Sequence, residues 1–126
     1  MRLLLLASAG GAIGAGARYL VSAGFMRWCA VEFPWATLTI NVVGCFLTGV
    51  LVAVFLRHWP EAPELRIFLT TGVLGGFTTF SAFAMEFIAL TERKAPMAAL
   101  LYVAGSVGLS IAACGIGLWL ARTALA

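Results

Sequence analysis

The sequence predicts an all-α membrane protein with four transmembrane helices. Of its 126 residues, 63% are hydrophobic and 10% are charged, and the mean hydropathy is +1.06. An ordinary soluble domain is only about 45–50% apolar. Four helices of roughly 20 residues, the length that crosses a bilayer, account for nearly the whole chain. We expect a single four-helix transmembrane domain over residues 1–126, with helices at about 3–26, 35–56, 67–90 and 97–121.

The first predicted helix, residues 3–26, follows Arg2 and is expected to be retained. A cleavable signal peptide needs an apolar core of about 7–15 residues, whereas the leucine run covers only positions 3–6. Gly10 and Gly14 form a GxxxG pair that allows another helix to approach closely, although glycine is common in membrane helices generally. Arg18 lies near the far end, where its side chain is expected to extend to the membrane interface.

The second and fourth predicted helices, residues 35–56 and 97–121, carry no formal charge. Each is long enough to span a bilayer, with some tilt for the fourth. Trp35 and Trp59 flank the second helix, as expected for an aromatic belt at the membrane interfaces.

The third predicted helix, residues 67–90, contains a glycine and threonine stretch that is predicted to break it. Gly75 and Gly76, followed by Thr78 and Thr79, weaken helix propensity. Carbonyl groups freed at membrane depth must find partners in protein or in a cavity filled with water or ions. Interrupted transporter helices bind Na⁺ through such carbonyls and face anions with half-helix N-termini. On a two-fold axis, two carbonyls per subunit would supply four ligands.

Basic residues are divided almost equally between the two predicted sides of the membrane. The side with both termini holds four basic residues, Arg2, Arg57, Arg66 and Arg122. The other side holds three, Arg27, Arg93 and Lys94, or four if Arg18 reaches that surface. The positive-inside rule then defines no clear orientation. Insertion in both orientations, and with it an antiparallel homodimer, is one outcome. The other is a single orientation set by the first helix or by a one-charge difference.

Neutral polar side chains follow two of the predicted helices at helical spacing. They are Thr37, Asn41, Gly44 and Thr48 in the second helix, and Tyr102, Ser106, Ser110 and Cys114 in the fourth. A hydroxyl group often bonds to its own helix, so interhelical packing accounts for any one of them. Asn41 is different, because its amide needs partners for two donors and an acceptor. It predicts either a binding site or a buried interhelical hydrogen bond.

These stripes offer hydrogen-bond donors without fixed charge, which favours an anion as the permeant. Cations take carboxylates or rings of carbonyls. A small anion takes N–H and O–H donors, together with the positive edges of aromatic rings. Phe80 and Phe83 can present such edges, with Phe77 and Phe87 in the same sector, although aromatic residues at this spacing usually form a core.

Other classes of function find no support in the sequence. The net charge of +3 is small and dispersed, unlike that of a nucleic-acid-binding protein. His58 lies at a predicted membrane edge, and the apolar spans hold no carboxylate pair, so we expect no enzyme activity. Cys29, Cys45 and Cys114 have neither pairing nor metal-ligand spacing, and we interpret them as packing residues.

Four motifs resemble the Fluc/CrcB family of bacterial fluoride channels over essentially the whole chain. They are GARYL around Arg18, WATLTINVVG around Asn41, GVLGGFTTFSAF in the third helix and YVAGSVGLS in the fourth. The third-helix motif is the specific one. The resemblance implies an antiparallel, dual-topology homodimer in the bacterial inner membrane. It also implies two pores that let fluoride leave the cytoplasm passively, and a Na⁺ ion on the two-fold axis.

The same resemblance implies roles for individual residues. The backbone carbonyls of Gly75 and Thr78 look like the Na⁺ ligands. The implied fluoride pathway comprises a phenylalanine pair, an amide donor, a polar track, a vestibule arginine and two neighbours: Phe80, Phe83, Asn41, Tyr102, Ser106, Ser110, Arg18, Thr37 and Ser81. Glu86 also matches the family in position. Ala82 and Ala84 replace hydroxyl residues that family members often carry, so no fluoride contact is expected at these two positions.

Two alternatives remain open at this point. A proton-coupled exporter of the small four-helix multidrug type shares the length, hydrophobicity and dual topology. Such an exporter relies on a carboxylate deep in the bundle, typically in the first helix, whereas the first helix here has no acid and Glu86 lies toward the end of the third. A structural or assembly subunit would account for the glycines but not for the inward donor stripes.

Overall fold

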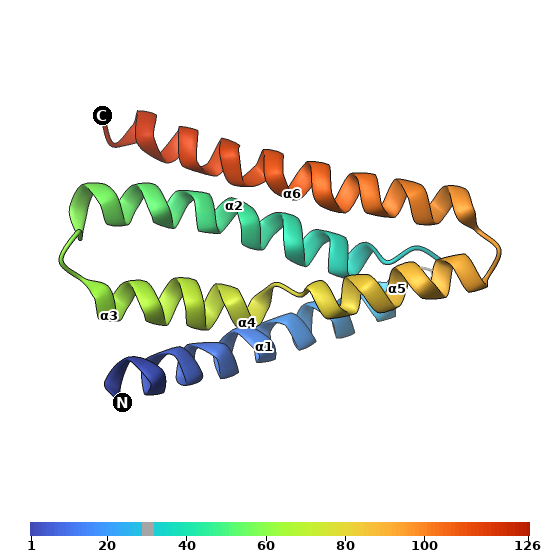
Figure 1. Cartoon of the computed structure of the whole chain (residues 1–126), viewed down its shortest axis with the longest axis horizontal. Helices are drawn as coiled ribbons and strands as arrows, with labels where there is room; N and C mark the ends of the chain where they lie inside the picture. Colours follow the sequence, from blue (N-terminus) through green and yellow to red (C-terminus); the bar gives the residue numbers. More distant parts are fainter. Residues whose placement is uncertain (29–31) are drawn as a thin grey trace.

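A computed structural model has four long apolar helical segments, as the sequence predicts (Figure 1). It describes residues 1–28 and 32–126, so the interpretation of Cys29 lies outside the described residues. The first, second and fourth segments are α1 (Arg2–Trp28), α2 (Trp35–His58) and α6 (Pro96–Ala124). The third segment is composed of four parts, α3 (Pro63–Arg66), η1 (Ile67–Leu74), α4 (Gly75–Phe77) and α5 (Phe80–Glu92).

The segments are a few residues longer than predicted, because polar residues and prolines at their ends are also helical. α2 continues to His58, and the third segment begins at Pro63 rather than at position 67. Proline is tolerated in the first turn of a helix, where an N–H group would have no helical partner. α6 begins with Pro96 for the same reason.

The third segment lies between α1 and α2, with α6 on the far side of α2 (Figure 1). α2 packs along α6, while α1 packs along η1 and α4. Both termini lie at the same end of the bundle, as an even number of spans requires (Figure 1). The predicted break in the third segment is therefore enclosed by helices on two sides.

Glycines set the close approach of α1 to the third segment. A Cβ atom at Gly14 would lie 2.0 Å from the carbonyl oxygen of Val73, and one at Gly10 would lie 2.5 Å from that of Phe68. No side chain fits at such distances, so the backbones are in direct contact. The close approach predicted from the GxxxG pair is confirmed, and the helix that approaches is η1 of the same chain.

The break falls at the threonines, and the glycines before it stay helical. Gly75 has right-handed helical dihedral angles (φ −64°, ψ −36°). Thr78 (φ −73°, ψ 156°) and Thr79 (φ −150°, ψ 125°) are extended. The predicted break in the glycine and threonine stretch is confirmed, and it falls at Thr78 and Thr79. Upstream of the break, η1 is a π-helix, which the sequence pattern did not predict.

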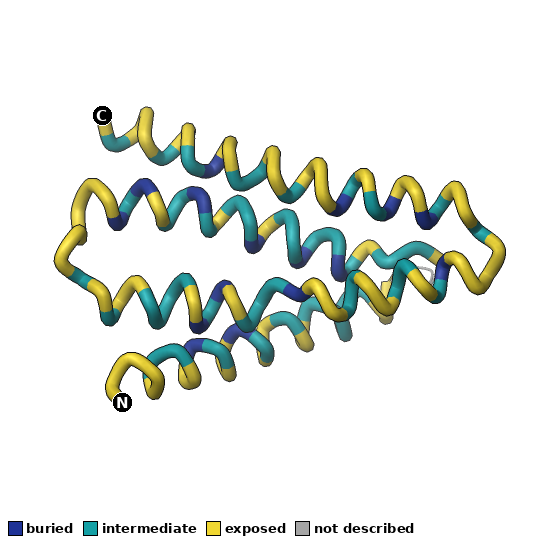
Figure 2. The backbone as a smooth tube through the Cα atoms, viewed as in Figure 1, coloured by how far each residue is buried: buried dark blue, intermediate teal, exposed yellow. Residues whose placement is uncertain are grey.

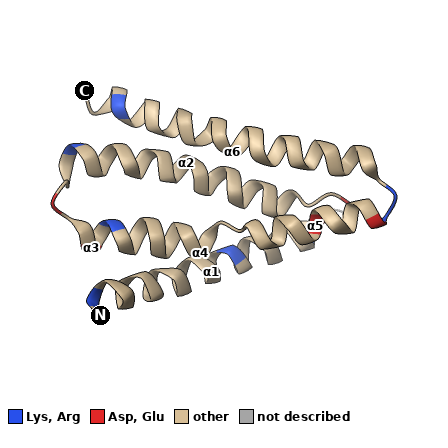
Figure 3. Ribbon diagram, viewed as in Figure 1, with Lys and Arg blue, Asp and Glu red and all other residues tan. Residues whose placement is uncertain are grey.

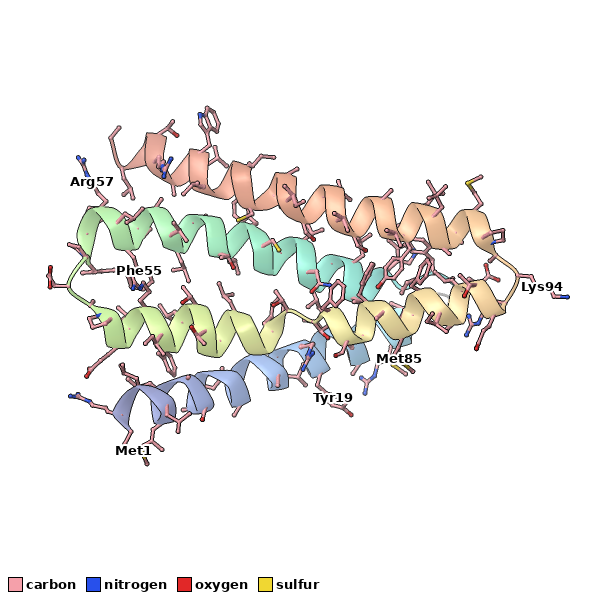
Figure 4. All side chains as sticks on the ribbon, in the orientation of Figure 1. Met1, Tyr19, Phe55, Arg57, Met85 and Lys94 are labelled. Atoms are coloured by element: carbon pink, nitrogen blue, oxygen red, sulfur yellow. The ribbon has the colours of Figure 1, made fainter. Side chains whose placement is uncertain are left out.

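Buried residues follow the facing sides of the helices (Figure 2), and many large hydrophobic side chains are exposed on the outer surface. Phe55 points between α2 and the third segment, whereas Tyr19 and Met85 point outward (Figure 4). Charged side chains gather at the two ends of the bundle (Figure 3). Within the apolar spans, the charged residues are Arg18 of α1 and Glu86 of α5. An apolar surface of this extent is suited to lipid or to a second protein surface.

Candidate ion-conduction site

Asn41 of α2 holds the break in the third segment through two hydrogen bonds to one residue. Its Nδ2 donates to the Thr79 carbonyl oxygen at 2.9 Å, and the Thr79 N–H donates to its Oδ1 at 2.8 Å. The amide thus replaces the backbone partners that Thr79 would have in a continuous helix. Of the two alternatives that the sequence leaves open for Asn41, the interhelical hydrogen bond is present. The amide nitrogen also carries a second N–H group.

The break diverts two backbone donors and so frees two carbonyl groups. In a continuous helix the N–H of Thr79 would bond to the Gly75 carbonyl, but it bonds to Asn41 instead. The N–H of Ala82 would bond to the Thr78 carbonyl, but it donates to Thr79 Oγ1 at 3.2 Å. Gly75 and Thr78 are the two residues that the family resemblance singles out as Na⁺ ligands. Backbone carbonyl oxygens without helical donors are suitable ligands for a hard cation.

A glycine of α2 makes room for the break. A Cβ atom at Gly44 would lie 2.3 Å from Cγ2 of Thr78 and 3.3 Å from Cδ1 of Phe77. The Thr78 hydroxyl donates to the Leu74 carbonyl at 3.0 Å, so its methyl group is the part that faces α2. Gly44, which the sequence analysis placed on the polar face of α2, therefore has a packing role.

A groove of about 420 Å³ runs beside the break, between α2, the third segment and α6. Its lining combines the freed backbone, the amide, two aromatic rings and the hydroxyls of α6. The lining residues are Asn41, Cys45, Gly75, Thr78, Thr79, Phe80, Phe83, Ser106, Val107, Ser110 and Ile111. Seven of the residues predicted from the sequence thus meet at one place: Asn41, Gly75, Thr78, Phe80, Phe83, Ser106 and Ser110.

Two hydroxyl groups in this groove have no hydrogen-bond partner within the described part of the chain. They are the Oγ atoms of Ser106 and Ser110, both of which are buried. Ser106 is only 6% exposed. A buried hydroxyl without a partner is costly, by about 1–3 kcal/mol. An accepting group that reached these hydroxyls would remove this cost.

The predicted phenylalanine pair lies at the start of α5, where the chain becomes helical again. The ring centroids of Phe80 and Phe83 are 5.3 Å apart, and Phe83 lies 5.2 Å from the ring of Tyr102. Phe80 is 78% exposed, at the rim of the groove, while Phe83 is half-buried. The two rings therefore differ in position, one facing outward and one facing the bundle interior.

Thr37 and Tyr102 form a second cluster with Glu86 and do not line the groove. Thr37 Oγ1 donates to Glu86 Oε1 at 2.8 Å, and the Tyr102 hydroxyl donates to Oε2 at 2.5 Å. Both donors are buried. Glu86 also borders a second hollow, of about 180 Å³, whose lining includes Arg93 and Glu32. The sequence predicts no specific role for Glu86, although a lone acid inside an apolar span is itself a signal of function.

The remaining predicted residues lie outside both clusters. Ser81 is exposed, and its hydroxyl shares a 3.3 Å hydrogen bond with that of Thr79. Arg18 is half-buried on α1 and is not among the groove residues. Thr48 donates to the Gly44 carbonyl of its own helix at 2.8 Å, which is the local bonding expected of many membrane threonines.

Comparison with known proteins relates the whole chain to one family. Residues 5–118 match the family described as "CrcB-like protein, Camphor Resistance (CrcB)". The fluoride-specific ion channel FluC of Rhodospirillum centenum is 50% identical over 126 residues, which covers 100% of both chains. Proteins of the same name from Chelativorans sp. and Rhizobium meliloti are 49% and 48% identical over 122 residues, covering 97% of this chain and 98% of each relative. The chain therefore belongs to the CrcB family.

Proposed function

We propose that the protein is a fluoride-selective ion channel that lets fluoride leave the bacterial cytoplasm passively. The observation that carries this proposal is the groove at membrane depth, in which the hydroxyls of Ser106 and Ser110 are buried without partners among the described residues. The relatives, whose sequences match this chain along nearly their whole length, carry names that support it. They describe ion channels, in agreement with the expectation that the chain is not an enzyme.

The groove is suited to a small anion that accepts strong hydrogen bonds. Among the described residues, no charged side chain lines it, so no fixed charge there would trap or repel the ion. The donors are the hydroxyls of Ser106 and Ser110 and the second N–H of Asn41, together with the positive ring edge of Phe83. Fluoride holds its water tightly and needs such donors to offset dehydration. Chloride accepts weaker hydrogen bonds and is larger, so a narrow path favours fluoride.

We infer that the path continues from the groove past Phe83 to the cluster around Glu86. Tyr102 contacts both places, since its ring lies beside Phe83 and its hydroxyl bonds to Glu86. Two O–H donors on the carboxylate of Glu86 reduce its repulsion of a passing anion. The second hollow, with Arg93 in its lining, then leads to the end of the bundle that holds the turn between α5 and α6.

The exporter alternative is not supported by the family. The described part of α1 contains no acidic residue, and both oxygens of Glu86 accept hydrogen bonds from neighbouring hydroxyls. The relatives carry the name of a channel.

We propose further that the channel is an antiparallel homodimer with Na⁺ between its two chains. The freed carbonyls of Gly75 and Thr78 border a groove that is open on one side of the chain, and Phe80 at its rim is 78% exposed. Lipid offers no donor or cation to such carbonyls, whereas a second copy and a shared cation do. Two carbonyls from each chain would give four oxygen ligands. The nearly equal division of basic residues supports the antiparallel arrangement.

Fluoride efflux from liposomes tests the proposed activity. Liposomes that contain the purified protein should release fluoride at least about tenfold faster than chloride, with a K⁺ ionophore to balance charge and without a proton gradient. An ion-selective electrode measures both anions. Equal release of the two anions would contradict the proposal, and strict dependence on a proton gradient would favour an exporter.

Alanine substitutions of the two unpartnered serines separate conduction from stability. Ser106→Ala and Ser110→Ala remove hydroxyls that are buried without a hydrogen-bond partner among the described residues, so the free energy of unfolding in detergent should not fall. Each removes a donor to the anion, worth about 1.5–3 kcal/mol, and fluoride efflux should fall by about tenfold or more. Ser8→Ala, on the exposed face of α1, is the matched control. Unchanged efflux in both variants would remove these hydroxyls from the path.

Replacing Na⁺ on both sides of the membrane by N-methylglucamine tests the cation proposal. A cation bound between two chains stabilises the folded dimer by roughly 3 kcal/mol at a hundred times its dissociation constant, so its removal should lower both the melting temperature and the fluoride efflux. Fluorescence-detected size exclusion after heating measures the dimer. If melting temperature and efflux are the same in Na⁺ and in the organic cation, no structural Na⁺ is present.

A further inference from the structure

Cys45 lines the groove but is not among the donors named above for the proposed anion path. It follows Asn41 by one turn of α2 and lines the same groove as Ser106 and Ser110. It is a free cysteine and is only partly buried. The groove thus brings Cys45 of α2 and Ser110 of α6 into one lining. The interpretation of Cys45 as a packing residue stays a prediction, and its place in the groove allows a second role.

The groove closes just beyond Cys45, where α2 and α6 make backbone contact. A Cβ atom at Gly49 would lie 2.1 Å from the carbonyl oxygen of Cys114, and one at Gly117 would lie 2.3 Å from that of Phe46. These two contacts leave no room for a passage between the helices at that level. Cys45 thus lies at the closed end of the groove. Cys114 belongs to the contact that closes it and is not among the groove residues.

The hydroxyls around Cys45 indicate that this end of the groove accommodates a ligand. Ser106 is only 6% exposed, and its Oγ has no hydrogen-bond partner in the described chain. The buried Oγ of Ser110 has none either. Because Asn41 and Cys45 line one wall and these serines the other, an anion between them would meet donors from both helices.

We propose that the Cys45 thiol forms part of the anion path and is a modification site at which a small thiol reagent closes the channel. The proposal rests on the proposed channel function. The thiol is a weak hydrogen-bond donor, so it extends the donor set by one turn of α2. Because the groove ends beside it, any group attached to the sulfur must extend back toward Ser106 and Ser110, into the space that the anion needs.

The reaction with methyl methanethiosulfonate is simple and reversible. The Cys45 sulfur, as its thiolate, attacks the methylthio sulfur of the reagent, and the thiol proton passes to the buffer. A sulfur–sulfur bond forms, and methanesulfinate leaves as the sulfur–sulfonyl bond breaks. The product is a methyl disulfide, which dithiothreitol reduces back to the thiol. The reagent is small and uncharged, so it enters the membrane from either side.

The experiment compares four proteins in liposomes, all with Cys29→Ser. They are this parent and its Cys45→Ser, Cys114→Ser and double variants. Each protein's fluoride efflux after the reagent is divided by its own untreated efflux, and intact mass counts the adducts. We expect parent and Cys114→Ser to lose about tenfold or more of their efflux and to recover with dithiothreitol. Cys45→Ser and the double variant should keep a ratio near one.

Each other outcome contradicts a separate statement. If the untreated parent transports no fluoride, the proposed function fails. If it transports fluoride and mass shows that Cys45 is modified without loss of efflux, the thiol is not in the path. If Cys45 reacts only after denaturation, the thiol is not accessible from the groove. If Cys114→Ser protects and Cys45→Ser does not, the modification site is at the other cysteine.

Discussion

The paired hydrogen bonds between Asn41 and Thr79 are the interaction on which the rest of the site depends. An interrupted helix inside a membrane leaves backbone groups unsatisfied, at several kcal/mol for each group that faces hydrocarbon. One amide side chain satisfies both the N–H and the carbonyl of Thr79. The Thr79 hydroxyl then caps α5 by accepting from Ala82. With these bonds in place, the chain stays extended at Thr78 and Thr79. The residues on either side of the break then differ in the charge that they present.

The two sides of the break offer opposite electrostatic character. Upstream, the carbonyls of Gly75 and Thr78 have lost their helical donors and present partial negative charge. Downstream, α5 begins with its N-terminus, which carries the positive end of the helix dipole, and with the ring of Phe80. This polarity would suit the proposed cation on one side of the interruption and the proposed anion path on the other. Direct backbone contacts hold the surrounding helices, α1 on η1 through Gly10 and Gly14, and α2 on α6 through Gly49.

Much of this architecture could be predicted from the sequence, because it depends on strong one-dimensional signals. Hydropathy located the four spans, and the GxxxG pair predicted a close helix contact. An amide at membrane depth had to have a partner, and Asn41 has one. The position of the break was less certain, since glycine lowers helix propensity but does not end a helix. The side-chain bonds of Asn41 and the cap at Thr79 decide where it ends.

Other features depend on contacts between residues distant in sequence and could not be read from spacing. The spacing of apolar residues in η1 does not indicate that this part of the chain is a π-helix. Thr37 and Tyr102 lie on the same faces as Asn41 and Ser106, yet Glu86 of α5 binds both hydroxyls away from the groove. The lone acid in an apolar span was the signal for that cluster. The surroundings of Cys45 also depend on such contacts, because nothing in the sequence shows that α2 and α6 meet one turn beyond it.

If one hydrogen-bonded break serves both proposed ion sites, the substitution Asn41→Leu should disrupt both. Leucine is similar in size but bonds to neither group of Thr79. Fluoride efflux and the Na⁺ dependence of the melting temperature should both be lost in this variant. Thr48→Val, which removes a hydroxyl bonded only within α2, should lose neither. An Asn41→Leu channel that keeps its Na⁺-dependent stability while losing efflux, or keeps both, would contradict the account.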